Sequence, residues 1–149
     1  MNYDQKILEA EDRLAIRELV DRYAYCADTR DAKGQMALFT NDTNFEVYYD
    51  PKADSPSEVY TGRPSLFPVF DNLNSYSATM HFNGQSTILS LNENTATGIT
   101  YCIAHHQTFE NNIQKLMVAY IRYKDRFVKQ DEKWFFAERK LLVDIIENR

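Results

Sequence analysis

Cysteine, glycine and proline are all scarce in this chain of 149 residues, which holds two cysteines, four glycines and four prolines. Cys26 and Cys102 are too few and too far apart for a disulfide-rich secreted scaffold or for a zinc or redox motif, so we expect buried free thiols. The glycines stand singly, which excludes a phosphate-cradling loop and a dinucleotide fingerprint. We therefore expect no cofactor.

Histidine is also scarce, with His81, His105 and His106 as the only three in the chain. His105 and His106 are adjacent within a predicted strand, so their side chains point to opposite faces and cannot hold one metal ion together. The sequence therefore predicts no metal site.

An excess of positive charge and long apolar runs are missing as well. The net charge is −5 from 17 basic and 22 acidic residues, and the basic residues are dispersed, which disfavours nucleic acid as a partner. The longest strongly apolar run, residues 116–121, is too short to span a bilayer, and no secretory signal precedes the first predicted helix. We expect a soluble, cytoplasmic protein without a membrane partner, forming one domain over residues 1–149.

Hydrophobic periodicity predicts helices first and strands afterwards. A first helix is expected from about Asp12, as its N-cap, to about Ala27, followed by a short helix at 35–39 and a strand at 43–49. A polar loop at 50–57, a candidate lid, precedes a third short helix that starts at 62–64 and runs to about Phe70. Turn-forming segments then separate predicted strands at 77–82, 85–91, 95–109, 115–129 and 133–146. This order predicts an α+β fold, with helices on one face of a strongly curved, mostly antiparallel sheet that encloses a pocket.

Strand alternation suggests which faces surround that pocket. The small face of the strand around Cys102, which is Thr100, Cys102, Ala104 and His106, is expected to line a cavity of a few hundred cubic ångströms. The opposite face carries Ile99, Tyr101 and Ile103, and the next strand presents Tyr120, Arg122, Lys124 and Arg126. Helices on one side of a sheet cannot cover both of these sets, so we expect a homodimer or homotrimer.

Asp28 interrupts an apolar stripe of the first helix, since it follows Ala24 by one turn. A buried carboxylate without a partner costs several kcal/mol, so it needs a partner or a chemical role. An inward aspartate with an inward histidine would form a minimal general-base pair, and all three histidines lie in predicted strands. The alternatives are that Asp28 belongs to a solvated helix exit and that His81 is a strand histidine bonded to backbone. For His105 and Arg139 we expect structural roles, Arg139 as a half-buried ion pair.

Several segments share an order and spacing across nearly the whole chain. They are residues 12–23, Ala27 with Asp28, Leu38 with Phe39, residues 80–82, residues 122–125, Trp134 and Arg139. Together they resemble the SnoaL-like branch of the nuclear-transport-factor-2-like (NTF2-like) superfamily, and the nearest pattern is that of scytalone dehydratase-like enzymes. The resemblance implies a cone-shaped α+β fold around a pocket.

The same resemblance implies a site. Its members pair an aspartate at the end of the first helix with a strand histidine, here Asp28 and His81, and His106 matches a second histidine. The active-site tyrosine of the family falls at about Val47, so Tyr48 or Tyr49 would have to replace it. The positions that hold substrate in the fungal enzyme fall near Ile121 and Tyr123, so that substrate is not implied.

The resulting hypothesis is a cofactor-independent lyase of the dehydratase type, or an isomerase, for a small, mostly apolar ring compound. The expected catalytic residues are Asp28, His81 and His106, and the expected substrate-binding residues are Tyr23, Phe39, Tyr48, Cys102 and Tyr123. One alternative is a noncatalytic binding or assembly subunit, such as the small subunit of a ring-hydroxylating dioxygenase. Another is an epoxide hydrolase using Asp28, Asp125 and Arg139, which would leave His81 without a role.

Overall fold

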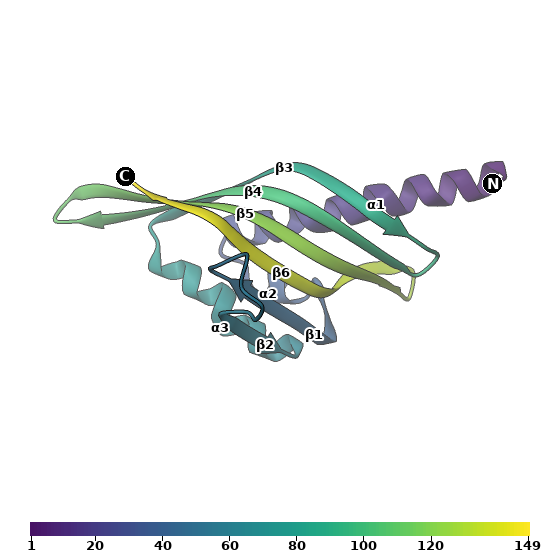
Figure 1. Ribbon diagram of the computed structural model, residues 1–149, viewed down its shortest axis with the longest axis horizontal. Coiled ribbons are helices and arrows are strands. Elements are labelled where there is room, and N and C mark those ends of the chain that lie inside the picture. Colours follow the sequence, from purple (N-terminus) through teal and green to yellow (C-terminus); the bar gives the residue numbers. More distant parts are fainter.

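A computed structural model describes residues 1–149 as a set of N-terminal helices beside one six-stranded sheet (Figure 1). None of its helices has the length and apolarity needed to span a lipid bilayer. The elements in chain order are α1 (Tyr3–Asp28), α2 (Ala32–Met36), β1 (Phe39–Tyr48), β2 (Glu58–Thr61), α3 (Leu66–Asp71, between 3₁₀ turns at Arg63–Ser65 and Asn72–Ser75), β3 (Ala78–Leu91), β4 (Thr95–Glu110), β5 (Ile113–Gln130) and β6 (Lys133–Asn148).

The strands are arranged in the order β2-β1-β6-β5-β4-β3, and every neighbouring pair is antiparallel except β1 with β6. Residues with left-handed backbone close the long hairpins, Asn111 and Asn112 between β4 and β5 and Asp131 and Glu132 between β5 and β6. Paired positive φ angles match the right-handed twist of the strands they join. The sheet curls without closing, which confirms the predicted α+β architecture.

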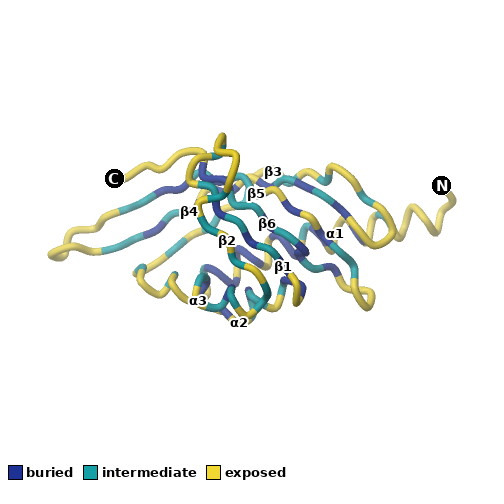
Figure 2. Tube along the Cα trace, turned by 60° about the horizontal axis from the view of Figure 1, so that its bottom comes forward, coloured by how far each residue is buried: buried dark blue, intermediate teal, exposed yellow.

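Helix α1 covers the inner face of the sheet along β3 and β4. Its buried residues Ile16, Leu19 and Val20 share one core cluster with Cys102 and Ala104 of β4. Thr100, Cys102 and Ala104 are buried and absent from the wall of the cavity described below, which corrects the prediction that they line it. Figure 2 shows that the N-terminal turns of α1 and the tip of the β4–β5 hairpin are exposed, whereas the middle of the sheet is buried.

Helix α1 also begins earlier than its periodicity indicated. Asn2 caps it by accepting from the backbone of Gln5, and the Gln5 side chain accepts from the backbone of Asn2. Asp12 is therefore no N-cap. It is buried within the helix, where its carboxylate accepts from the indole of Trp134 at 2.9 Å and pairs with Lys129 at 2.9 Å.

Three further boundaries differ from the predictions. Asp31 caps the N-terminus of α2 by accepting from the backbone of Gly34, so this helix begins before the predicted residue 35. It ends at Met36, and Phe39 already belongs to β1. The segment Asn83-Gly84 is no turn, because β3 continues through it with a shift of register between Asn83 and Ser86. The four-residue strand β2 was not predicted, and it forms the edge of the sheet next to β1.

Candidate active site

A cavity of about 480 Å³ lies over the part of the inner face that α1 leaves uncovered. This volume suits a small ring compound and confirms that the fold holds a cavity of a few hundred cubic ångströms. Most of its wall is apolar, supplied by Phe45, Val47, Val69, Phe70, Met117, Ala119, Ile121, Leu141 and Val143. The polar side chains of the wall belong to four tyrosines, two histidines, Gln35, Glu58 and Asn72, and no lysine or arginine is among them.

Asp28 is the last residue of α1, and it meets β3 at Thr79 and His81. Its Oδ1 accepts from the His81 ring nitrogen Nδ1 at 2.8 Å and from the Thr79 hydroxyl at 3.0 Å, while Oδ2 accepts from the His81 backbone N–H at 2.9 Å. The solvated-exit alternative for Asp28 is therefore wrong, and the His81 ring is bonded to this carboxylate rather than to backbone.

These contacts determine the charge of Asp28 and which ring nitrogen of His81 donates to it. Burial alone would raise the pKa of Asp28, but the hydrogen bonds from His81 and Thr79 outweigh it and hold that pKa below its usual range. An ionised carboxylate can only accept, so Nδ1 of His81 carries a proton, and the neutral tautomer compatible with this contact has its free lone pair on Nε2. The His81 ring lines the cavity.

Arg30 supports this arrangement from the segment after α1. Its guanidinium donates to the Thr79 hydroxyl oxygen at 2.7 Å and to the Ala27 carbonyl oxygen at 2.8 Å. Because the Thr79 oxygen accepts from Arg30, its own hydrogen is directed to Asp28. Sequence reasoning missed both residues, although Thr79 lies two positions before His81 and so shares its strand face.

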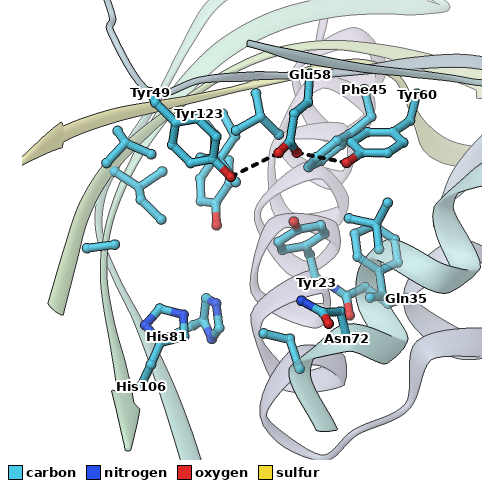
Figure 3. Close-up of a pocket in the computed structure, with 18 of the residues that line it drawn as sticks. Tyr23, Gln35, Phe45, Tyr49, Glu58, Tyr60, Asn72, His81, His106 and Tyr123 are labelled. Atoms are coloured by element: carbon cyan, nitrogen blue, oxygen red, sulfur yellow. Dashed lines mark hydrogen bonds between the residues drawn. The ribbon is translucent and has the colours of Figure 1, made fainter. Parts of the chain in front are cut away.

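His106 lies beside His81 in the wall of the cavity (Figure 3). The two ring centroids are 5.8 Å apart in an edge-on arrangement. The His106 Nδ1 is 3.2 Å from the Met117 carbonyl oxygen, so it donates there and Nε2 is the acceptor. Burial, and then the nearby His81, lower the pKa of His106 and favour the neutral ring.

The predicted substrate-binding residues divide into two groups. Tyr23 and Tyr123 line the cavity. Phe39 is fully buried in the aromatic core, and Cys102 lies in the core cluster, where burial raises the pKa of its thiol to about 11. Tyr48 is absent from the cavity wall and donates to Glu46 at 3.2 Å.

A polar group in the cavity wall is formed by Tyr49, Glu58 and Tyr60. Of these, the sequence singled out only Tyr49, as a possible replacement for the active-site tyrosine of the family. The Tyr49 hydroxyl donates to Glu58 Oε1 at 3.2 Å, and the Tyr60 hydroxyl donates to Oε2 at 2.7 Å (Figure 3). The available signal was the alternation of Glu58 and Tyr60 along a short strand, which places both side chains on one face.

Arg139 forms a fully buried pair with Asp125, at 2.9 Å and 3.4 Å. The rings of Tyr23 and Tyr123 stack on its guanidinium at 4.1 Å and 3.6 Å. The ion pair was predicted as half-buried, and it is instead completely enclosed. Neither Arg139 nor Asp125 lines the cavity, so the geometry does not favour an epoxide hydrolase. No three histidine, cysteine, aspartate or glutamate residues are grouped so that they could hold a metal ion.

Helices on a curled open sheet, with an apolar cavity between them, make up an NTF2-like fold. The chain belongs to the SnoaL-like domain family, whose sequence model matches residues 8–140. A comparison with curated protein sequences gave no match.

Solved structures share this fold over nearly the whole chain. A scytalone dehydratase-like protein from Novosphingobium aromaticivorans DSM 12444 is 23% identical, with a TM-score of 0.81 over 97% of this chain and 91% of its own. A protein of unknown function from Mycobacterium tuberculosis is 26% identical, with a TM-score of 0.78 over 97% and 77%. Hexachlorocyclohexane dehydrochlorinase LinA type 3 from Novosphingobium barchaimii LL02 is 14% identical, with a TM-score of 0.79 over 97% and 94%.

Proposed function

We propose that this protein is a cofactor-independent lyase or isomerase that acts on a small, mostly apolar ring compound. The observation that carries the proposal is the contact between Asp28 and His81, which leaves the His81 Nε2 lone pair at an apolar cavity. Two of the structures similar to this chain are named for a dehydratase and a dehydrochlorinase, and both names denote elimination reactions.

In the proposed reaction, His81 Nε2 removes a proton from a carbon next to a carbonyl or a leaving group. The electron pair of the broken C–H bond forms a double bond, while the bond to the leaving group breaks and that group departs with its electron pair, or, in an isomerisation, the carbonyl oxygen takes up the negative charge. Asp28 stabilises the positive charge that develops on the imidazole. The proton then passes to the leaving group or, in an isomerisation, to another carbon of the same molecule. His81 therefore ends in its starting state without any cofactor.

Tyr23 and Tyr123 are the groups best suited to stabilise negative charge on the substrate. Burial raises the pKa of Tyr23 to about 12 and the pKa of Tyr123 well above its usual value, so both hydroxyls keep their protons and remain donors. A donor aimed at a developing oxyanion is a large contribution to rate in many enzymes. The neutral His106 accepts a hydrogen bond through Nε2 and so orients a hydroxyl of the substrate.

Elimination of 5-nitrobenzisoxazole tests the proposal without knowledge of the natural substrate. A base removes the ring C–H proton, the N–O bond breaks, and the coloured 2-cyano-4-nitrophenolate forms. We expect the wild type to exceed the rate in buffer and His81→Ala to lose about 10²-fold or more. His105→Ala is the matched control, because His105 lies on the same strand as His106 and is absent from the cavity wall. Equal rates for the wild type and His81→Ala would contradict the proposal.

A noncatalytic ligand-binding or assembly subunit is the second candidate. One similar structure, from Novosphingobium aromaticivorans, is named as an aromatic ring hydroxylase and is 19% identical to this chain. The apolar cavity would serve binding equally well. This candidate predicts no elimination that depends on His81, and it predicts that a larger partner copurifies with the chain.

We also propose that the chain forms a homodimer or homotrimer through the outer face of the sheet. Ile103 pairs with Tyr120 and Tyr101 with Arg122, so the two faces distinguished in the sequence form one surface. Phe82 continues it on β3, where 67% of its surface is exposed. An exposed apolar area of this kind is typical of a subunit contact.

A further inference from the structure

Glu58 is a carboxylate set into the wall of the apolar cavity, remote in the sequence from the Asp28–His81 pair. It lies on the edge strand β2 directly opposite Val47, and Tyr60 lies opposite Phe45. Directly paired residues of antiparallel strands share a face, and all four of these residues line the cavity. Val59, which lies between Glu58 and Tyr60, faces outward and is 53% exposed.

The surroundings of Glu58 leave its carboxylate with spare hydrogen-bonding capacity. Each oxygen accepts one bond, from Tyr49 or from Tyr60, and each retains a further acceptor site. Glu58 forms no ion pair with any lysine, arginine or histidine. A carboxylate beside apolar side chains gains most from an additional donor, because a charged acceptor forms stronger hydrogen bonds than a neutral one.

The two tyrosines do not offer donors to a ligand at this place. The hydrogen bond to Glu58, followed by burial, raises the pKa of Tyr60 to about 12, while burial and then Glu58 raise the pKa of Tyr49. Both hydroxyl protons therefore stay on their oxygens and are directed to Glu58. What this part of the wall presents to a ligand is a set of acceptors.

The cavity consequently has two chemically different regions. His81 and His106 stand together in one region, and Glu58 stands with Tyr49 and Tyr60 in the other (Figure 3). No lysine or arginine lines the cavity to balance a negatively charged ligand. A ligand that spans both regions is thus best matched by a molecule that donates hydrogen bonds where it meets Glu58.

We propose that Glu58 is a specificity-determining residue that binds a hydroxyl or amine donor on the ligand. The substrate would then be an apolar ring compound with a donor group at the end away from the carbon that His81 deprotonates. The position of this donor relative to the reacting carbon rests on the proposed function, whereas the binding of a donor by Glu58 does not.

Glu46 on β1 provides a matched control, because it makes the same kind of contact outside the cavity. Its Oε1 accepts from the Tyr48 hydroxyl at 3.2 Å and its Oε2 accepts from Asn44 at 3.0 Å. Neither Glu46 nor Tyr48 lines the cavity. Glu46→Gln therefore makes the same substitution at a similarly bonded carboxyl group without touching the subsite.

Equilibrium binding of three fluorescent naphthalenes tests the proposal. The probes are 2-naphthol, which carries a hydroxyl donor, 2-methoxynaphthalene, which carries none, and naphthalen-2-ylmethylamine, which carries an ammonium donor. We expect the wild type and Glu46→Gln to bind 2-naphthol or the amine about tenfold more tightly than the methoxy compound, as one hydrogen bond to a charged acceptor allows. Glu58→Gln should reduce that preference to about twofold or less. The better of the two donor probes identifies the donor group.

Two results would overturn the proposal. One is a wild type that shows no preference for either donor probe, and the other is a preference that survives in Glu58→Gln or falls equally in Glu46→Gln. Circular dichroism and thermal midpoints establish that each variant is folded when its affinity is measured. The elimination of 5-nitrobenzisoxazole depends on His81 and is measured separately, so a failure of the subsite and a failure of the proposed function are distinct outcomes.

Discussion

His81 binds Asp28 twice, through its ring Nδ1 at 2.8 Å and through its own backbone N–H at 2.9 Å. The backbone bond holds the carboxylate at a fixed place relative to the strand, and the ring bond then orients the imidazole relative to that carboxylate. One residue therefore determines both the position of the acid and its own orientation. This coupling predicts that the two side chains act as a unit.

A double-mutant cycle on the rate of 5-nitrobenzisoxazole elimination measures whether Asp28 and His81 act as a unit. Asp28→Asn should remove most of the rate, about tenfold or more, because an amide can present its N–H₂ group to Nδ1 and reverse the tautomer. The double variant with His81→Ala should be little slower than His81→Ala alone, since removal of either partner disables the same step. Rate losses that multiply in folded variants would contradict a dyad.

Because the pKa of Asp28 is lowered in the folded protein, part of the free energy of unfolding should be lost in acid. A carboxyl whose folded pKa lies below its unfolded value binds fewer protons when folded, so its contribution is fully present above the unfolded pKa of about 3.9 and is lost as pH falls through the folded pKa. The free energy of unfolding of the wild type should therefore fall more steeply than that of Asp28→Asn between about pH 5 and pH 2. Urea unfolding at several pH values measures this difference. Parallel profiles for the two proteins would exclude the contribution.

The buried pair of Arg139 and Asp125 predicts a large loss of stability when one partner is removed. Arg139→Met leaves an unpaired carboxylate in the core, and the free energy of unfolding should fall by about 3–5 kcal/mol. Adding Asp125→Leu should recover part of this loss, because no buried charge then remains. The control is Arg13→Met, which breaks a half-exposed pair with Glu9 on α1 and should cost about 1 kcal/mol or less. Equal losses of unfolding free energy for the two arginine variants would contradict the prediction that the buried pair matters more than the exposed one.

If the outer face of the sheet is the subunit contact, one charged residue introduced there should disrupt the assembly. Phe82→Arg places a cation in the proposed contact, so sedimentation at micromolar concentration should shift from a dimer or trimer to a monomer. Leu14→Arg is the control, because Leu14 is 72% exposed on α1. A monomeric wild type, or an unchanged assembly state in Phe82→Arg, would rule out this interface.

The sequence predicted the parts of the site that local pattern can reveal. Asp28 stood out because an acid interrupted an apolar helical stripe, and His81 was selected through the family resemblance. The antiparallel character and the curvature of the sheet followed from long alternating segments with turn residues between them. Apart from the family resemblance, these signals depend on residues close together in the chain.

Contacts between distant segments could not be predicted in the same way. Asp12 has the residue type of an N-cap, but Trp134 and Lys129, from the other end of the chain, make it a buried acceptor. Cys102 was assigned to the cavity because its strand face is small, whereas α1 occupies that space. Glu58 went unnoticed because a strand of four residues has too little alternation to distinguish it from a loop.

Asp12 and Asp28 are both buried or half-buried carboxylates of α1, and each is bound to a different strand. An α-helix turns by about 100° and rises about 1.5 Å for every residue. Insertion or deletion of a single residue between the two would therefore swing one carboxylate away from its partner while the other stayed in place. The number of residues between Asp12 and Asp28 is consequently fixed by the fold. Residues 51–56, between β1 and β2, contribute no side chain to the cavity wall, so a change of length there would leave that wall in place.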